Sequence, residues 1–299
     1  MITVLMSTYN GERHLREQLD SIVAQNGVEP PSIIVRDDGS SDGTIAILDD
    51  YKSRGLLMWY QGDNVGPARS FMQLLSEAPD SDYYAFSDQD DLWLPEKLQV
   101  ACDKLSEMAG NKPSLYIGQT QPANSNLSPM AFKAQNPRCT FGEAVVHPYA
   151  SGCTMMMNRK LRDIVISYTP QYIYMHDWWI VVIATAIGAD IVYDAHPHML
   201  YRQHETNVIG SNDSLCTEWG RRLTRMRSTQ RHSRSLMAAE LKEGFYQLMS
   251  RENRDMLDRF LTGRHSLRQR MLLLADRRFR PDGLKNYIFF KLAVLLNTY

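Results

Sequence analysis

Short apolar runs alternate with helical patterns over about the first ninety residues of the chain. The strand-like runs cover residues 2–6, 32–35, 56–60 and 83–87. Between them lie stretches with apolar residues at helical spacing, of which the first carries Leu15, Leu19, Ile22 and Val23 on one face. This alternation predicts an α/β fold, in which helices cover both faces of a mostly parallel sheet.

Polar clusters follow three of these runs, at residues 7–10, 37–42 and 88–91. Ligands of such sheets bind outside the carboxyl ends of the strands. The last cluster holds three carboxylates, Asp88, Asp90 and Asp91, which repel one another unless a cation or ribose hydroxyls take up their charge. Oxygen ligands suit magnesium or manganese, so the pattern indicates a divalent-metal site, although an acidic loop before Pro95 would look the same.

Four ordered motifs resemble the nucleotide-sugar signature of family 2 glycosyltransferases with the GT-A fold: STYN at 7–10, RDDGSSD at 36–42, NVGPAR at 64–69 and SDQDD at 87–91. In the second half, SGCTM at 151–155, HDWW at 176–179 and YRQH at 201–204 resemble the bacterial rhamnosyltransferases of that family, which build surface polysaccharides. The resemblance covers about residues 1–230 and implies a Rossmann-like, mostly parallel nucleotide-binding sheet.

The resemblance assigns roles to the nucleotide side of the site. Asp91 would be the direct metal ligand, with Asp88 and Asp90 on ribose hydroxyls or on waters around the metal. Asp38 would accept the imide N–H of uracil or thymine, although an Asp-Gly turn needs no such function. The remaining nucleotide-side candidates are Ser7, Thr8 and Tyr9, the last two flanking the pyrimidine, and Arg69, a phosphate or base contact or simply a solvated arginine.

The resemblance also implies a catalytic base. Asp177 would remove the proton of the acceptor hydroxyl, and His176 stands where the family usually has an acidic residue. Asp177 could instead, or in addition, cap the helix predicted over 178–187. The tryptophans Trp178 and Trp179 would stack on the acceptor or belong to the core.

Two residues near position 200 are further candidates. His204 would complete the metal shell or be an ordinary surface histidine, because a neutral imidazole is a competent ligand. Arg202 could grip the phosphates through its planar guanidinium. Whether His204 binds the metal or Arg202 binds the phosphates stays open at this point.

Charge divides the chain into two regions. Residues 1–216 contain 15 Lys and Arg against 26 Asp and Glu, whereas residues 217–299 contain 18 against 8. We expect a GT-A catalytic domain over 1–216, with a nucleotide-sugar half over about 1–110 and an acceptor half over about 111–216, and a basic helical extension over 217–299. The extension would either bind an anionic membrane surface or pack as a bundle with a solvated basic face. A nucleic-acid partner is not expected, because no recognised motif accompanies the arginines.

The spacing of the cysteines, the N-terminal segment and the length of the apolar stretches predict where in the cell the protein is found. The four cysteines form no CxxC pair, which is typical of free thiols in a reducing compartment. The N-terminus has no signal-peptide pattern, and no apolar stretch approaches ~20 residues. We therefore expect a cytoplasmic protein that is either free or peripheral on the inner face of the cell membrane.

Together these features predict an inverting glycosyltransferase that depends on magnesium or manganese. The subfamily motifs favour transfer of L-rhamnose from dTDP-rhamnose to a polyprenyl-diphosphate-linked glycan in the synthesis of O-antigen, capsule or cell-wall polysaccharide. The alternatives are a UDP-hexose transferase for galactose or glucose, and a nucleotide-sugar-binding protein without turnover.

Overall fold

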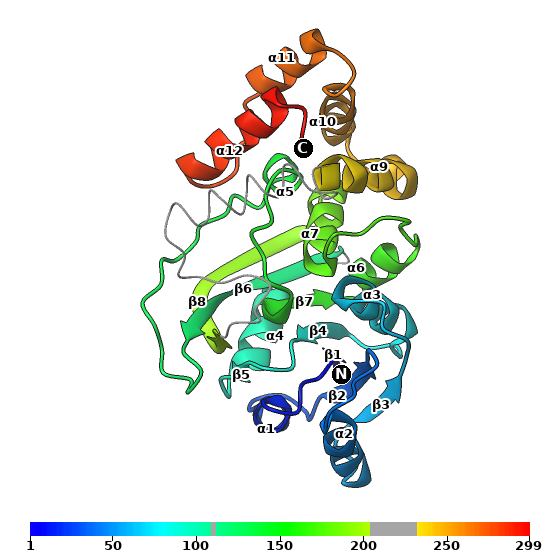
Figure 1. Cartoon of the computed structure of the whole chain (residues 1–299), viewed down its shortest axis with the longest axis vertical. Helices are drawn as coiled ribbons and strands as arrows, with labels where there is room; N and C mark the ends of the chain where they lie inside the picture. The colour runs from blue at the N-terminus through cyan, green and yellow to red at the C-terminus, as the bar shows by residue number, and fades with distance from the viewer. Residues whose placement is uncertain (109–111, 204–231) are drawn as a thin grey trace.

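The computed structural model describes residues 1–108, 112–203 and 232–299. Its centre is an eight-stranded sheet with the strand order β3-β2-β1-β4-β7-β6-β8-β5. Helices lie on both sides of this sheet, and further helices extend the molecule at one end (Figure 1).

The nucleotide half of the sheet is parallel, as the alternation predicted. Its strands are β1 (Ile2–Thr8), β2 (Ser32–Asp37), β3 (Met58–Gln61) and β4 (Tyr83–Ser87). The helices that cross between them are α1 (Leu15–Val23), α2 (Thr44–Ser53) and α3 (Pro67–Glu77). Along β1, Val4 and Met6 enter the core beneath α1 and α2, whereas Leu5 enters the core beneath α3. The strand is apolar on both faces because helices cover both.

The predicted element ends shift by a few residues. β1 continues to Thr8, and β3 begins at Met58 rather than at residue 56. α3 begins at Pro67, because Gly66 has a φ of 78° and ends the preceding loop in a left-handed conformation. Proline suits the first helical position, where its missing N–H has no partner to lose.

The second half of the sheet is mixed. Its strands and helices are β5 (Leu92–Trp93), α4 (Lys97–Glu107), β6 (Ser114–Ala123), α5 (Phe141–Ala144), η1 (a 3-10 turn, Gly152–Thr154), β7 (Met155–Asn158), α6 (Arg159–Ile166), α7 (His176–Ile187) and β8 (Asp190–Arg202). β7 runs antiparallel to both β4 and β6 and so joins the two halves. β8 runs parallel to β6 and antiparallel to β5, which brings the end of β8 beside the acidic loop that follows β4.

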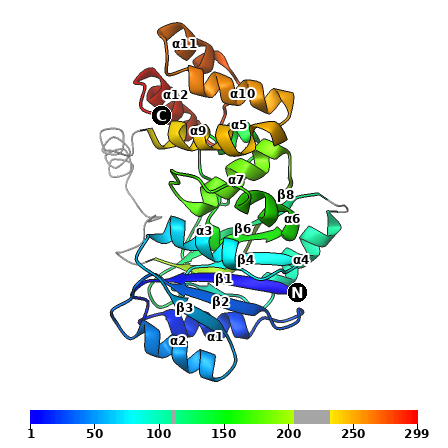
Figure 2. The same ribbon diagram turned by 90° about the vertical axis from the view of Figure 1, so that its right-hand side faces the viewer.

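The expected helical C-terminal extension is present. It consists of α9 (Ser233–Phe245), η3 (Tyr246–Leu248), α10 (Arg251–Thr262), α11 (Leu267–Ala275) and α12 (Leu284–Leu295). Phe260, Phe279 and Phe290 form its aromatic centre, and Tyr299 stacks edge-on against Phe260. These helices lie beyond α5 and α7, at the end of the molecule away from β1 to β3 (Figure 2). The predicted boundary at 216/217, Cys216 and the arginines between 221 and 231 lie outside the described residues.

No helix in the described parts of the chain combines the length and the apolar character that crossing a membrane requires. The helices of the extension instead bury one side in the shared core, which includes Phe245 of α9 and Val294 of α12. The C-terminal helices therefore pack as a bundle against the catalytic domain.

Candidate active site

The loops after β1 and β2 are tied together by short hydrogen bonds. Thr8 Oγ1 donates to Asp37 Oδ2 over 3.0 Å, and the other oxygen of Asp37 accepts the N–H groups of Gly39 and Ser40 at 3.1 and 2.8 Å. The Ser7 hydroxyl pairs with that of Ser70 at 2.6 Å. The hydroxyls of Ser7 and Thr8 thus both form hydrogen bonds within the protein.

Asp38 has an internal role that the sequence did not reveal. Its buried carboxylate forms an ion pair with the Arg36 guanidinium and accepts the N–H groups of Val65 and Gly66 at 3.0 and 2.9 Å. It therefore fastens the loop after β3 to the end of β2. Three internal donors thus hold the Asp38 carboxylate, and its expected contact with a pyrimidine base stays a prediction.

Tyr9 and Arg69 keep exposed side chains. Half of the Tyr9 surface is exposed, while its backbone N–H and C=O are held by the Gln89 side chain at 2.9 and 3.0 Å. The Tyr9 ring is thus free to stack while its backbone is fixed. Arg69 donates to the Gln171 carbonyl over 3.2 Å and borders a hollow of about 320 Å³ whose lining includes Met72 and Ile173.

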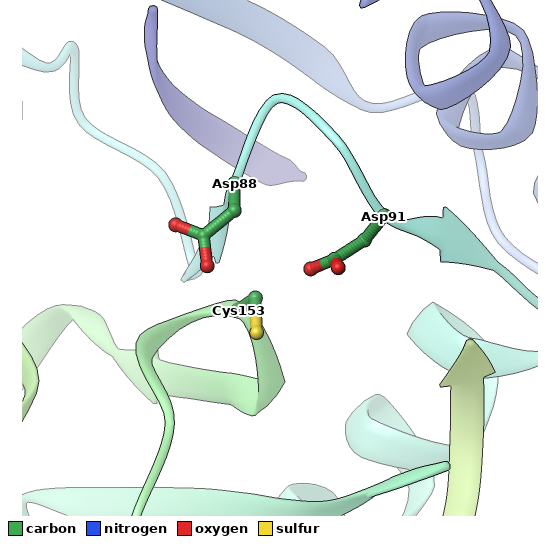
Figure 3. Close-up of side chains that lie close together, drawn as sticks. All are labelled: Asp88, Asp91 and Cys153. Carbon is green, nitrogen blue, oxygen red and sulfur yellow. The ribbon is translucent and has the colours of Figure 1, made fainter. Parts of the chain in front are cut away.

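Two acidic residues and a thiol meet beyond the end of β4. One ligand atom each of Asp88, Asp91 and Cys153 lies within 4.8 Å of the other two, and the three side chains lie close together (Figure 3). Asp91 and Cys153 are fully buried, and Asp88 is half-buried. Asp90 is outside this group but adds its negative charge to both carboxylates.

The electrostatics of this cluster favour a bound cation. Burial, with repulsion from Asp90 and Asp177, raises the pKa of Asp88 to about 7. Burial and the charges of Asp88 and Asp90 raise the pKa of Asp91 well above its usual value. Asp91 Oδ1 accepts the Arg202 N–H at 3.2 Å, while no N–H or O–H group of the described chain donates to its buried Oδ2, and the Cys153 thiol is the neighbouring donor. A divalent ion would satisfy that oxygen and remove the repulsion, so the residues fit a metal.

Arg202 braces this loop instead of reaching outward. The side chain is buried, and its guanidinium donates to the carbonyls of Asp90, at 2.8 Å, and Ser125, and to the Glu17 carboxylate. Three of the five N–H groups of the guanidinium are bound by these internal acceptors, and the expected grip of Arg202 on phosphates stays a prediction. His204 lies outside the described residues.

Asp177 faces the acidic cluster from the start of α7. Its Oδ2 accepts the Gly152 N–H at 3.1 Å, and its Oδ1 accepts the Trp178 N–H at 2.6 Å. Burial raises the pKa of Asp177 to about 6 despite these donors. The charge of Asp177 also acts on Asp88, so residues far apart in the chain belong to one site.

The neighbours of Asp177 belong to the core. His176 is 2% exposed and stacks on Phe71 with ring centroids 4.1 Å apart. Burial lowers the pKa of His176 to about 3, so the ring is neutral. Trp178 donates to the Ala144 carbonyl at 2.7 Å, and the fully buried Trp179 packs against Phe245. The expectation that His176, Trp178 and Trp179 contact an acceptor does not hold here, and the core alternative for the tryptophans is confirmed.

Two residues of the site escaped the sequence analysis. Cys153 was part of a recognised motif, but its spacing gave no sign of metal ligation. Lys97 is buried with its Nζ 3.8 Å from the centre of the Trp93 ring. Burial lowers the pKa of Lys97 to about 8, although the charges of Cys153 and Asp91 oppose the shift. Nothing in the local sequence distinguishes Lys97 from a surface lysine.

A sheet that gathers acidic side chains outside the ends of its parallel strands is typical of α/β proteins that bind a ligand at that edge. The family model described as glycosyl transferase family 2 matches residues 3–165, and the chain belongs to that family. It is 31% identical over 233 residues to the dTDP-rhamnosyl transferase RfbG of Shigella flexneri, covering 72% of this chain and 77% of that protein.

Two solved structures share the fold. The S. aureus TarS fragment 1–349 in complex with UDP-GlcNAc has a TM-score of 0.59 at 17% identity, over 100% of this chain and 92% of that chain. The mannosyltransferase PcManGT of Pyrobaculum calidifontis, in complex with GDP-Man and Mn2+, has a TM-score of 0.53 at 14% identity, over 99% and 86% of the two chains. The predicted GT-A fold and glycosyltransferase class are thereby confirmed.

Proposed function

We propose that this family 2 glycosyltransferase moves L-rhamnose from dTDP-rhamnose to a glycan carried on a polyprenyl diphosphate, with inversion at the anomeric carbon. The observation that carries the proposal is the convergence of Asp177 with Asp88 and Asp91 at one edge of the sheet. Similarity to the Shigella flexneri dTDP-rhamnosyl transferase supports the choice of donor. The reaction would serve the assembly of O-antigen, capsule or cell-wall polysaccharide.

Asp177 is the proposed general base. A pKa of about 6 leaves the carboxylate ionised at neutral pH yet basic enough to accept a proton late in bond formation. The Gly152 and Trp178 N–H groups fix both oxygens, so that the carboxylate keeps one direction without a flexible loop. The acceptor hydroxyl would attack from this side while the nucleotide leaves from the other.

Asp88 and Asp91 are the proposed ligands of a divalent cation, and Asp90 contributes further negative charge beside them. When bound, the cation would stabilise the charge that develops on the departing nucleotide diphosphate. Arg202 fixes the backbone of this loop through the Asp90 carbonyl. Tyr9 is the proposed stacking surface for the pyrimidine, because its ring is exposed beside the ends of β1 and β4.

A UDP-hexose donor is the second candidate. It is supported by the UDP-GlcNAc complex of TarS and by a 21% identical glucosyltransferase of Escherichia coli, WfgD, which is described as using UDP-Glc. Binding without turnover is less consistent with the site, because a carboxylate with a raised pKa of about 6 beside the acidic cluster suits a proton acceptor.

A donor screen tests the choice. Purified protein would be incubated with dTDP-rhamnose, UDP-glucose and UDP-galactose in manganese or magnesium, and the released nucleotide diphosphate would be measured. We expect release of dTDP to exceed release of UDP. Release of UDP alone would establish the second candidate, and donor binding without any release would establish a non-catalytic protein.

We also propose that the C-terminal helices hold the enzyme at an anionic membrane, where a lipid-linked acceptor is found. Half of the exposed large apolar side chains of the described chain belong to one region, the α11–α12 surface: Leu267, Met271, Leu272, Leu284, Ile288, Leu292, Leu295 and Leu296. Residues 263–299 carry eight Lys and Arg against two Asp. Apolar side chains beside positive charge suit the interface of an anionic bilayer.

Vesicle co-sedimentation tests this surface. We expect binding to vesicles of mixed neutral and anionic lipid, weakening with salt because each basic residue near the surface contributes roughly 1 kcal/mol. Leu284→Glu, at a position 75% exposed, should reduce binding, whereas Met58→Glu on β3, at 57%, should not. Equal binding by the two variants, or binding that salt does not change, would assign the exposed leucines another role.

A further inference from the structure

A thiol is built into the acidic cluster. Cys153 belongs to η1, the turn that leads into β7, and its side chain lies close to those of Asp88 and Asp91 (Figure 3). The sulfur and one oxygen of each carboxylate lie within 4.8 Å of one another. Two ligands of one ion lie at most about two bond lengths apart, roughly 4–5 Å for oxygen and sulfur donors. All three atoms can therefore reach a single cation with little movement.

A second observation points to a ligand at this place. Asp91 is 0% exposed, and no N–H or O–H group of the described chain donates to its Oδ2, which leaves the Cys153 thiol as the hydrogen-bonding neighbour of this carboxyl. Ionisation of this buried carboxyl is costly unless a cation balances its charge, because one weak S–H donor does not replace the lost hydration. The Lys97 ammonium acts on Asp91 and on Cys153 but sits over the Trp93 ring. One such charge does not balance Asp88, Asp90 and Asp91 together.

We propose that Cys153 is a sulfur ligand of the donor-site cation, and that the site therefore prefers a borderline-soft ion such as Co²⁺ or Zn²⁺ to Mg²⁺. This inference rests on the metal site of the proposed function. Thiolate sulfur binds such ions far better than it binds Mg²⁺, whereas carboxylate oxygen suits both kinds of ion. On binding, the S–H bond breaks, the metal–sulfur bond forms and the proton leaves to the solvent, with no change of oxidation state.

Cobalt(II) reports sulfur ligation directly. Titration of the full chain with Co²⁺ should produce the near-ultraviolet charge-transfer band of a cobalt–thiolate bond, with release of one proton per ion in weakly buffered solution. Cys153→Ser and Cys153→Ala should lose the band and bind Co²⁺ at least about tenfold more weakly, while Mg²⁺ affinity changes little. Cys102→Ser in α4 is the matched control and should keep the band. Circular dichroism establishes that each variant is folded.

The outcomes separate this inference from the metal site itself. A ¹¹³Cd chemical shift in the sulfur range on the wild-type protein supports the inference even if a Cys153 variant fails to fold. Co²⁺ binding that Asp91→Asn weakens, but that lacks the charge-transfer band and the proton release, overturns Cys153 as a ligand and leaves the carboxylate site standing. Absence of Co²⁺ binding overturns the inference, and sugar transfer measured with and without EDTA then shows whether the metal dependence of the proposed function fails as well.

Discussion

At the scale of single residues, the properties of Asp177 follow from burial and from two backbone N–H groups. Burial alone would favour the neutral acid, whereas the donors from Gly152 and Trp178 favour the anion. The balance leaves a pKa of about 6, which suits a base that works at neutral pH. The same residue type at position 38 is bound by Arg36 and serves the fold. The surroundings of the two aspartates, and not their residue type, make Asp177 the proposed base and Asp38 a structural residue.

Asp177→Asn should lower kcat by roughly two to four orders of magnitude, because the amide keeps the size of the side chain but cannot accept a proton. Donor binding, measured by calorimetry, should survive. In the wild type, kcat/KM should rise with pH through about 6 and then level off, because the base works only when deprotonated. The exposed acid variant Asp163→Asn is the control. A variant at Asp177 with near wild-type turnover would mean that another group is the base.

At the scale of elements, the contact between η1 and α7 places the base beside the metal cluster. A Cβ atom added at Gly152 would lie 2.5 Å from His176 Nε2 and 3.6 Å from Asp177 Cβ. The turn thus packs directly on the first residues of the helix, and the adjacent Cys153 enters the acidic cluster. A movement of η1 would disturb both halves of the site at once.

Gly152→Ala should therefore reduce both stability and kcat. Overpacking of this kind costs about 1–3 kcal/mol in the free energy of unfolding, measured in denaturant. The comparison is Gly55→Ala, where the φ of +73° imposes strain but nothing lies within 4 Å of the new Cβ. That variant should lose stability while keeping kcat. If Gly152→Ala lost stability alone, η1 would not position the base.

At the scale of the whole molecule, stability should depend on pH in an unusual direction. The folded-state pKa values of Asp88 and Asp177, about 7 and about 6, lie above the ordinary value of 3.8. Between those values the folded protein binds more protons than the unfolded chain, so this contribution to stability is lost as pH rises. His176 acts in the opposite sense between about 3 and 6.5, because its buried ring must be protonated on unfolding.

We expect the free energy of unfolding of metal-free protein to fall from about pH 5 to pH 8 and to recover when a divalent cation is added. The recovery should be larger at pH 8, where the carboxylates are ionised. Asp88→Asn should flatten the decline while leaving the contribution of His176 in place. Thermal unfolding scans at several pH values, with and without Mn²⁺, provide the measurement. A decline that is equally steep in Asp88→Asn would place its origin elsewhere.

The sequence by itself determined the elements and the edge of the sheet at which the site lies. Alternating periodicity is a property of neighbouring residues, so β1 to β4, α3 and the start of α7 could be read from the chain, and polar residues at strand ends indicated the binding edge. The same local reading identified the cluster at Asp88 to Asp91 and the position of Asp177 at a helix start.

The tertiary structure alone decided which of these polar groups are free. Asp38 meets Arg36 and the backbone after β3, and Arg202 meets Glu17 and Ser125, so both are bound by partners that no local pattern reveals. α7 is buried on all sides, which removed its aromatic residues from the surface. Pairing of the antiparallel strand β7 with β4 places the preceding turn η1, and with it Cys153, beside the acidic loop. Burial and partner choice depend on contacts between segments far apart in sequence, and only the folded chain fixes them.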